Sequence, residues 1–559
     1  MPTLHWIGKE KVINHHLDVP FKVLEHSYGF DNGTLTSTET QSGNKIIHGD
    51  NLEALKALLP EYEGQIKCIY IDPPYNTGKD EWKYNDRVDH PRIKSWFDKI
   101  VGKEGEDLSR HDKWLCMIYP RLVLLHKLLK DEGVLLVSID NNELYSLKIV
   151  LDEIFGPFNL VGNIIWKNAT DNNPTQIANE HEYILCYSKK KTELAPEWKS
   201  PNLDVKEKLL NIGKEFVERY SDPEELQIEY TKWFRENKQF LWPFEDYKFI
   251  DSGGVYTGSR SVHNPGKEGY RYDVIHPITK KPCKQPLMGY RFPESTLNEL
   301  IDRKRIIFGE DESKIIELKL YAFDYRAKLS SVIELDGRKG ANTIKDVFET
   351  TNTPFKNPKT TELIEEILSF TTSKDDVVLD SFSGSGTTAH AVLNLNKQDG
   401  GNRRFICIEM EDYAETITAE RVKRVINGYG EDKKEVEGTG GSFDFYELGQ
   451  SLFDEDGNLN ESVGLTKIRN YVWYTETKTP LKEERQEDNA HFLGKHNDTS
   501  YYFYYESEAI TTLDHSFLAS IKTKAEQYVI YADNCLLTKE FMVKHHLIFK
   551  KIPRDITRF

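Results

Sequence analysis

Two short segments carry residue types that could hold a planar, amine-bearing ligand and act on it. The first is Asp72-Pro73-Pro74-Tyr75, which follows the apolar run QIKCIYI. Two consecutive prolines end a strand and keep the backbone extended, because neither has an N–H group and each restricts the residue before it. The Asp72 carboxylate and the Pro73 carbonyl would accept the two N–H bonds of an exocyclic amine while Tyr75 stacks on the ring. A tight turn with a surface tyrosine is the alternative.

The second segment is Asp380-Ser381-Phe382-Ser383-Gly384-Ser385-Gly386, between a predicted strand DDVVLD and a predicted helix SGTTAHAVLNLN. Gly384 and Gly386 let the backbone approach a ligand closely, and a helix N-terminus offers free N–H donors. Glu409 ends the next strand, RFICIE, where a carboxylate can hold the hydroxyls of a ribose. The dinucleotide pattern GxGxxG is absent, which favours an adenosyl ligand without phosphates over NAD.

The elements around both segments alternate between short apolar runs and longer helical patterns. From Lys45 the chain reads strand KIIHGD, helix NLEALKALL and strand QIKCIYID. Farther on, apolar residues recur every three or four positions before the apolar run GVLLVSID, at Leu115, Ile118, Leu122, Leu125 and Leu129. This alternation predicts an α/β fold with a parallel sheet. Both motifs follow strands, and open α/β sheets bind ligands at the carboxyl ends of their strands.

At 559 residues, the chain is long enough for three or four domains at roughly 150 residues each. The stretch NGYGEDKKEVEGTGG has the composition of a linker. The predicted segments are an N-terminal arm (1–44), a first half of the α/β domain (45–190), a separate mixed domain (191–345), a second half (346–430) and a C-terminal domain (441–559).

The overall charge is acidic, so any surface for nucleic acid must be local. Lys and Arg total 74 against 91 Asp and Glu, a formal net charge of −17. Between Arg260 and Arg305 the balance reverses, with ten Lys and Arg residues against five Asp and Glu residues. This window predicts contact with a polyanion, with an ordinary solvated face as the alternative.

Several classes of protein are disfavoured. No run of about 18 apolar residues occurs and the N-terminus lacks an apolar signal core, so we expect a cytoplasmic protein with no membrane span. The six cysteines are scattered without a CxxC pair, which predicts reduced thiols and no structural metal. No helicase P-loop, GxxxxGK[ST], is present.

DPPY followed by FSGSG resembles the amino-methyltransferases of DNA, which use S-adenosylmethionine. The order of the two motifs resembles the circularly permuted β group of that family. NPKTTELIEEIL resembles the family's motif ten, and HGDN resembles the strand end whose Asp50 would flank the cofactor adenine. HWIGKEKVINHH and FKKIPRDI are similar to segments of type III restriction-modification Mod subunits. The resemblance implies a permuted Rossmann-like methyltransferase fold with an inserted target-recognition domain (191–345) and a small C-terminal domain.

The resemblance also implies roles for individual residues. Asp72 and Pro73 would orient an adenine N6 amine that has been flipped out of the duplex, and Tyr75 would stack on the base. Asp380 would meet the methionine amino group, and Glu409 the ribose. The implied catalytic residues are Asp72, Pro73, Pro74 and Tyr75, and the implied cofactor residues are Asp50, Asp380, Ser381, Phe382, Gly384, Gly386 and Glu409.

Trp166, in a segment resembling motif eight, is either a packing residue for the flipped base or a core tryptophan. Pro282-Cys283 lies in the irregular middle segment, and direct transfer to an amine requires no cysteine nucleophile. The implied activity is site-specific methylation of adenine N6 in double-stranded DNA, by a Mod homodimer joined by a helicase-nuclease Res subunit. The alternatives are a cytosine N4 methyltransferase, although the acidic first residue of DPPY favours adenine, and a noncatalytic DNA-specificity subunit.

Overall fold

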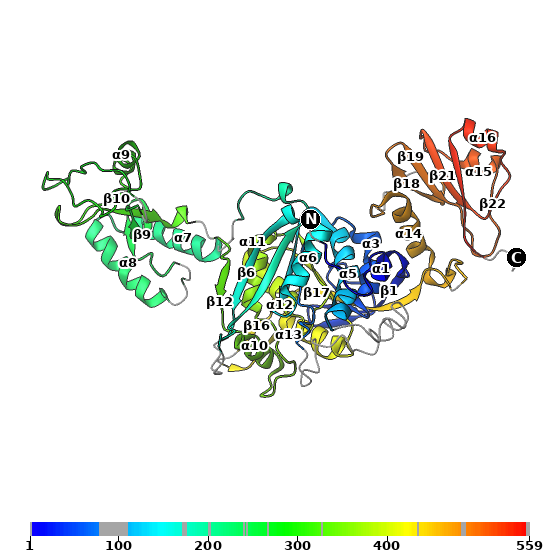
Figure 1. Ribbon diagram of the computed structural model, residues 1–559, viewed down its shortest axis with the longest axis horizontal. Helices are drawn as coiled ribbons and strands as arrows, with labels where there is room; N and C mark the ends of the chain where they lie inside the picture. Colours follow the sequence, from blue (N-terminus) through cyan, green and yellow to red (C-terminus); the bar gives the residue numbers. More distant parts are fainter. Residues whose placement is uncertain are drawn as a thin grey trace. The chain divides into compact units, whose positions relative to one another are not determined.

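A computed structural model describes most of the chain. The described residues are 3–77, 110–169, 176–198, 203–238, 241, 244–264, 268–325, 328–432, 435–454, 456–481 and 488–554. They fall into two compact units, one made of Met1–Glu197 with Ser330–Phe559 and the other of Trp198–Leu329 (Figure 1).

The first unit is built on a large mixed sheet. Its strands among the described residues lie in the order β12-β6-β7-β5-β4-β13-β14-β3-β17-β1-β2. Their bounds are β1 (Lys22–Asp31), β2 (Thr34–Thr36), β3 (Lys45–His48), β4 (Ile66–Ile71), β5 (Leu129–Ile139), β6 (Leu160–Lys167), β7 (His181–Ser188), β12 (Val332–Glu334), β13 (Val377–Asp380), β14 (Arg404–Glu409) and β17 (Ser442–Ser451).

The centre of this sheet is parallel. Strands β5, β4, β13, β14 and β3 pair in parallel, whereas β7 pairs antiparallel with both β5 and β6. Cys68 and Ile69 of β4 lie opposite Val378 and Leu379 of β13. The carboxyl ends of these two strands therefore lie side by side, although about three hundred residues separate them in sequence.

Helices flank the sheet (Figure 1). Their bounds are α1 (Lys9–Val12), α2 (His15–Asp18), α3 (Asn51–Tyr62), α5 (Arg110–Leu128), α6 (Leu144–Phe155), α10 (Arg338–Phe348), α11 (Thr361–Thr371), α12 (Thr387–Asp399) and α13 (Glu420–Asn427). Ile69 and Ile71 of β4 belong to one buried apolar cluster with residues of α3, α5 and α6. Cys68, which points to the opposite face, contacts Thr371 of α11. The period-two alternation thus places helices on both faces, and the predicted α/β fold is confirmed.

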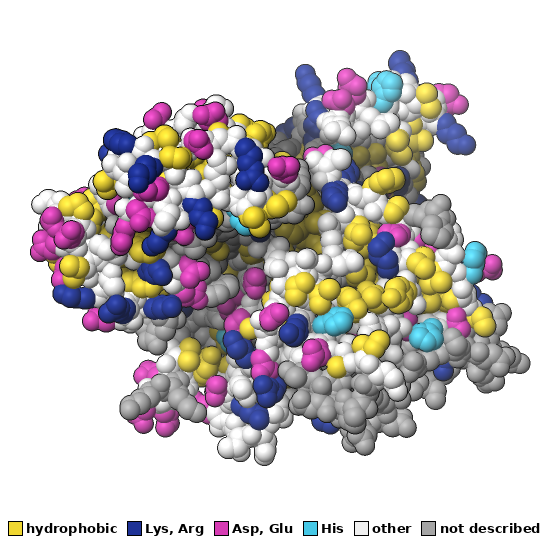
Figure 2. All heavy atoms as spheres, turned by 60° about the vertical axis from the view of Figure 1, so that its left-hand side comes forward, with side chains coloured by type: hydrophobic (Ala, Val, Ile, Leu, Met, Phe, Trp, Pro, Cys, Tyr) yellow, Lys and Arg dark blue, Asp and Glu magenta, His cyan; other side chains and the backbone are white. Residues whose placement is uncertain are grey.

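The second unit, Trp198–Leu329, has two apolar clusters of its own. Its elements are α7 (Leu203–Arg219), α8 (Pro223–Asn237), β8 (Phe249–Asp251), β9 (Gly254–Ser261), α9 (Glu294–Asp302), β10 (Ile306–Ile307) and β11 (Glu317–Tyr321), with sheet order β10-β11-β9-β8. Asp222 caps α8 by accepting hydrogen bonds from the N–H groups of Glu224 and Glu225. On the face that Figure 2 shows, acidic and basic side chains are interspersed, with apolar side chains exposed among them.

The C-terminal part of the first unit holds a smaller mixed sheet, in the order β18-β19-β21-β23. The elements here are α14 (Leu465–Thr477), β18 (Phe492–His496), β19 (Thr499–Phe503), β20 (Thr512–Leu513), α15 (His515–Ser520), β21 (Gln527–Ala532), β22 (Asn534–Cys535), α16 (Lys539–Lys544) and β23 (Leu547–Lys551). The aromatic run YYFYY begins within strand β19, whose Tyr502 and Phe503 are buried.

The structure differs from the predicted segments at three places. Residues 22–36, assigned to an N-terminal arm, form β1 and β2 of the large sheet. β1 pairs antiparallel with β17 but carries two register shifts, and such bulges break the alternation that would reveal a strand in sequence. β17, assigned to the C-terminal domain, also belongs to this sheet.

The middle unit spans Trp198–Leu329 rather than residues 191–345. It ends earlier because β12 pairs with β6, and α10 follows β12 in the first unit. The predicted linker holds a short two-stranded pair, β15 (Gly428–Tyr429) with β16 (Val436–Glu437). None of the described helices has the length and apolar character needed to cross a membrane.

Candidate active site

Asp72 lies at the junction of two cavities. It follows β4 directly, as Asp380 ends β13, so the pairing of these strands brings the two motifs together. A cavity of about 520 Å³ is lined by Asp72, Pro73, Tyr75, Trp166 and Lys359 among others. A smaller cavity of about 30 Å³ is lined by Asp72 together with Asp380, Phe382, Gly384 and Thr388 among others. One carboxylate therefore faces both spaces.

Other elements fix the turn after β4. The indole N–H of Trp114, in α5, donates a hydrogen bond of 2.6 Å to the Pro74 carbonyl. Asn76, whose φ is +58°, donates a 2.5 Å hydrogen bond to the buried carboxylate of Glu143.

Asp72 itself is held without a complete set of hydrogen bonds. Its Oδ1 atom is buried and has no hydrogen-bond partner in the described structure, although Lys359 Nζ lies 3.2 Å away. Burial raises the pKa of Asp72, and the nearby Lys359 opposes that rise. A buried acceptor with spare capacity at the wall of a cavity is a candidate ligand contact.

Two residues at this site, Lys359 and Glu182, were not found from sequence. Lys359 Nζ donates hydrogen bonds of 2.7 Å to Glu182 Oε2 and to the Tyr75 hydroxyl oxygen. The Tyr75 hydroxyl in turn donates to Glu182 Oε2 at 2.8 Å, which fixes the ring by its outer end. Asn168 donates to the other oxygen of Glu182 at 2.7 Å. A signal was present for Glu182, which is a charged residue within the otherwise apolar strand sequence HEYILCYS.

The glycine segment forms the expected turn before α12. Asp380 accepts hydrogen bonds from the Phe382 N–H at 3.0 Å and the Thr388 hydroxyl at 2.5 Å, and burial raises its pKa to about 7. Gly386 has a φ of +79° and precedes α12 directly. The Ser381 hydroxyl is buried with no hydrogen-bond partner in the described structure.

A fully buried arginine supports this turn from behind. Arg421, in α13, donates hydrogen bonds of 2.9 Å to the Ser385 and Thr387 hydroxyl oxygens. It also donates to Thr361 in α11 at 3.1 Å. Burial lowers the pKa of Arg421 to about 10, so it stays charged at neutral pH. The glycine turn is therefore anchored to two helices by one cation.

The structure places Glu409 and Asp50 beside the glycine turn, where each bonds to backbone. Glu409 accepts hydrogen bonds from the N–H groups of Gly384, Met410 and Glu411 at 2.8 to 3.1 Å, and burial raises its pKa to about 7. Asp50 caps α3 by accepting from the Leu52 N–H at 2.8 Å. Their predicted contacts with ribose and adenine remain predictions.

Trp166 lines the larger cavity and is 3% exposed. Its indole N–H donates a hydrogen bond of 2.8 Å to the Leu335 carbonyl. Both predicted roles, core residue and wall of a base pocket, therefore fit its position. Cys283 lies in the other unit, buried in an apolar cluster.

A family model described as DNA methylase matches residues 66–420. The chain is 49% identical to the EcoP15I Mod subunit of Escherichia coli, a type III restriction-modification enzyme, over 73% of this chain and 64% of that protein. It is 33% identical to the StyLTI Mod subunit of Salmonella typhimurium, over 65% of this chain and 52% of that protein. The chain thus spans about half to two thirds of the length of these relatives. Among solved structures, the chain is similar to the cytosine-N4-specific PvuII DNA methyltransferase, at 12% identity over 68% of this chain and 86% of that one. The TM-score is only 0.32.

Proposed function

Because this chain belongs to the DNA methylase family, we propose that it transfers a methyl group from S-adenosylmethionine to the N6 amine of adenine in double-stranded DNA. We further propose that it does so as the modification subunit of a type III restriction-modification system. The similarity to two type III Mod subunits supports the second statement. The observation that carries the first is the position of Asp72, which lines both the larger cavity and the cavity of the glycine turn.

The glycine turn carries groups suited to an adenosyl cofactor. The Asp380 carboxylate is suited to a cationic amino group, and the unpartnered Ser381 hydroxyl is a spare donor and acceptor at the same turn. S-adenosylmethionine supplies an electrophilic methyl group on a sulfonium. The residues that would hold it are Asp50, Asp380, Ser381, Phe382, Gly384, Gly386 and Glu409.

The larger cavity fits a flipped base. Taking a base out of a duplex costs a few kcal/mol, which stacking on aromatic side chains offsets. Tyr75 is held by Lys359 and Glu182 through its hydroxyl, so its ring is preorganised for stacking. Asp72 and the Pro73 carbonyl would accept the two N–H bonds of the amine.

The proposed step is a direct displacement. Hydrogen bonding to Asp72 and Pro73 localises the amine lone pair, which forms the new N–C bond while the S–C bond breaks and its electrons remain on sulfur. The amine proton leaves along its hydrogen bond to the Asp72 carboxylate and then passes to water. The chain needs no nucleophile of its own.

We propose that the middle unit recognises the target sequence, because it contains the basic window between Arg260 and Arg305. A homodimer and a helicase-nuclease Res subunit are the partners that a type III Mod subunit would have. Cytosine N4 is the second candidate target, since the Pro-Pro-Tyr turn accommodates either amine, and the acidic first residue of DPPY favours adenine. A noncatalytic specificity subunit would keep the fold without the acceptor at position 72.

The test is incubation of the protein with labelled S-adenosylmethionine and duplex DNA, followed by nucleoside analysis of the product. We expect label in N6-methyladenine, none in N4-methylcytosine, and none with Asp72→Ala. The matched control is Asp131→Ala, which removes an exposed carboxylate that pairs with Lys190 and should methylate as the wild type does. Wild-type protein that labels no DNA, tested over varied sequences, would refute the proposed activity.

A further inference from the structure

The Lys359 ammonium lies among three acceptors at the base of the larger cavity. Its side chain is only 11% exposed. Glu182 Oε2 and the Tyr75 hydroxyl oxygen each lie 2.7 Å from Nζ and accept hydrogen bonds, whereas Asp72 Oδ1 lies at 3.2 Å. The ammonium therefore directs hydrogen bonds to Glu182 and Tyr75 and approaches Asp72 as a neighbouring charge.

That Lys359 donates to Glu182 and Tyr75 matters because Asp72 Oδ1 accepts no hydrogen bond in the described structure. A lysine that donated fully to Asp72 would compete with the incoming amine for the same lone pairs. Here the charge is compensated while the hydrogen-bonding capacity of the oxygen stays open. Glu182 makes this possible, because it anchors the ammonium from the other side and is itself fixed by Asn168.

Burial has the largest effect on Asp72 and raises its pKa, and the charge of Glu182 raises it further, whereas Lys359 and the Tyr75 hydroxyl lower it. Glu182 and Asp380 are acids whose charges repel that of Asp72, and Tyr75 and Tyr70 are phenols with raised pKa values. Among the described groups acting on Asp72, Lys359 is the cation. Its own pKa is raised to about 12, because the attraction of Asp72 and Glu182 outweighs the effect of burial.

We propose that Lys359 is a positioning residue for methyl transfer: it keeps the Asp72 carboxylate charged and correctly placed while leaving its acceptor oxygen free for the target amine. The inference rests on the proposed function, since it assigns a role within the same site. A charged Asp72 is required twice in the proposed step, first to localise the amine lone pair and then to receive the amine proton. A neutral carboxyl group does neither.

The experiment measures kcat/KM for DNA methylation from pH 5.5 to 9.5 in the full-length protein. In Lys359→Met, we expect the acid limb of the profile to move to higher pH by at least about one unit, so that activity at a given pH on that limb falls about tenfold and recovers at higher pH. Lys359→Arg, which keeps the charge, should keep the acid limb close to that of the wild type even if kcat falls. A purely structural role would lower activity equally at all pH values.

Glu182→Gln should shift the acid limb of the pH profile in the opposite direction. Removing this acid takes a repelling charge away from Asp72, so the acid limb should move to lower pH. This variant remains informative if Lys359→Met does not fold, which cofactor binding and thermal unfolding would report. Lys397→Met removes the same charge from the exposed ion pair with Glu437 and should leave the profile unchanged.

An acid limb that stays in place in Lys359→Met, or that moves upward in Glu182→Gln, would overturn the inference while wild-type methylation continued. Wild-type protein without activity at any pH would instead refute the proposed function itself. The two failures are therefore distinguishable.

Discussion

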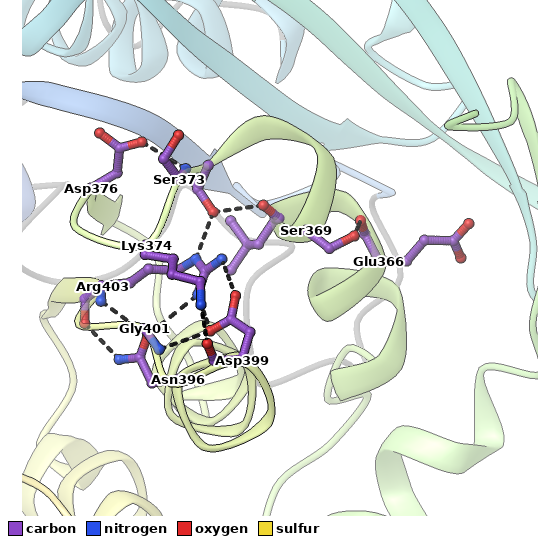
Figure 3. Close-up of polar contacts among 11 residues, drawn as sticks. Glu366, Ser369, Ser373, Lys374, Asp376, Asn396, Asp399, Gly401 and Arg403 are labelled. Carbon is purple, nitrogen blue, oxygen red and sulfur yellow. Dashed lines mark hydrogen bonds and ion pairs between the residues drawn. The ribbon is translucent and has the colours of Figure 1, made fainter. Parts of the chain in front are cut away.

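Two ion clusters lie at opposite ends of strands of the large sheet. At the amino end of β14, Arg403 and Asp399 form a bidentate pair with distances of 3.0 and 2.8 Å (Figure 3). Arg403 also donates to the Thr372 hydroxyl at 3.0 Å, and Asp399 accepts from the Gly401 N–H at 2.9 Å. At the carboxyl ends, Asp72 shares Lys359 with Glu182 and keeps an unsatisfied oxygen.

The difference separates a structural cluster from the cluster that we propose is functional. Each oxygen of Asp399 has a donor, and hydrogen bonds from Arg403 outweigh burial and lower the pKa of Asp399. Burial instead raises the pKa values of Asp72 and Asp380, and both carboxylates line cavities. Asp380 has a donor to each of its oxygens, as Asp399 does, whereas Asp72 Oδ1 has none and keeps the capacity to accept a hydrogen bond from a ligand.

The largest effect on stability should come from breaking the structural cluster. Arg403→Leu leaves the buried Asp399 charge uncompensated, so we expect the free energy of unfolding to fall by about 3–5 kcal/mol. Urea denaturation would measure it. The exposed ion pair removed by Lys397→Met should cost less than about 1 kcal/mol. Equal losses of unfolding free energy in both variants would mean that the Arg403–Asp399 pair stabilises the fold no more than an exposed ion pair does.

Substitution in the Asp72 cluster should have the opposite outcome: activity should fall and stability should not. In Asp72→Asn we expect kcat/KM to fall about 10²- to 10³-fold, the usual scale for losing one preorganised electrostatic contact. The free energy of unfolding should stay the same or rise, because an incompletely satisfied buried charge is removed. Steady-state methylation and urea denaturation of the same preparation would measure both. A stability loss comparable to that of Arg403→Leu would contradict the distinction.

Gly386, in the glycine turn, and Gly400, next to Asp399, allow the effect of the same substitution to be compared at the two sites. Gly386 and Gly400 both have positive φ, +79° and +63°, so alanine strains each backbone by about 1–2 kcal/mol. A Cβ on Gly400 meets open space, whereas one on Gly386 would lie 3.2 Å from the Thr418 carbonyl oxygen. We therefore expect Gly386→Ala to cost more stability and to weaken S-adenosylmethionine binding, and Gly400→Ala to leave binding unchanged. Calorimetry that finds equal affinity in both variants would refute this expectation.

Asp380, in the glycine turn, and Asp399 should give opposite pH dependence to the stability of the ligand-free protein. The folded pKa of Asp380 is raised to about 7, so the stability it contributes is present below about pH 4 and is lost as pH rises toward 7, by about 1 kcal/mol per pH unit. Asp399, with a lowered pKa, contributes stability that is lost as pH falls below its ordinary value. The dependence of the unfolding temperature on pH should therefore become weaker above pH 4 in Asp380→Asn and weaker below pH 4 in Asp399→Asn. The reverse pattern would contradict these assignments.

Much of the site follows from local sequence. Asp72 and Asp380 each end an apolar run, so their place at the carboxyl ends of strands could be predicted from the βαβ alternation, whereas the pairing of β4 with β13 comes from the structure. Glu182 stands out in sequence as a charged residue in a strand, but its pairing with Lys359 could not be predicted. Lys359 comes from the segment before α11 and Glu182 from β7, and only the tertiary fold brings them together. The same limit explains β1, whose bulges hide its period.

The central claim is that Asp72 serves two ligands at once. The most direct measurement is a crystal structure of the protein with a nonreactive analogue of S-adenosylmethionine and a DNA duplex containing its target. We expect the analogue at the turn formed by residues 380–386 and the adenine amine within hydrogen-bond distance of Asp72, with the acceptor nitrogen about 3–3.5 Å from the position of the donor methyl. An analogue bound away from that turn, or an amine that does not reach Asp72, would contradict the claim.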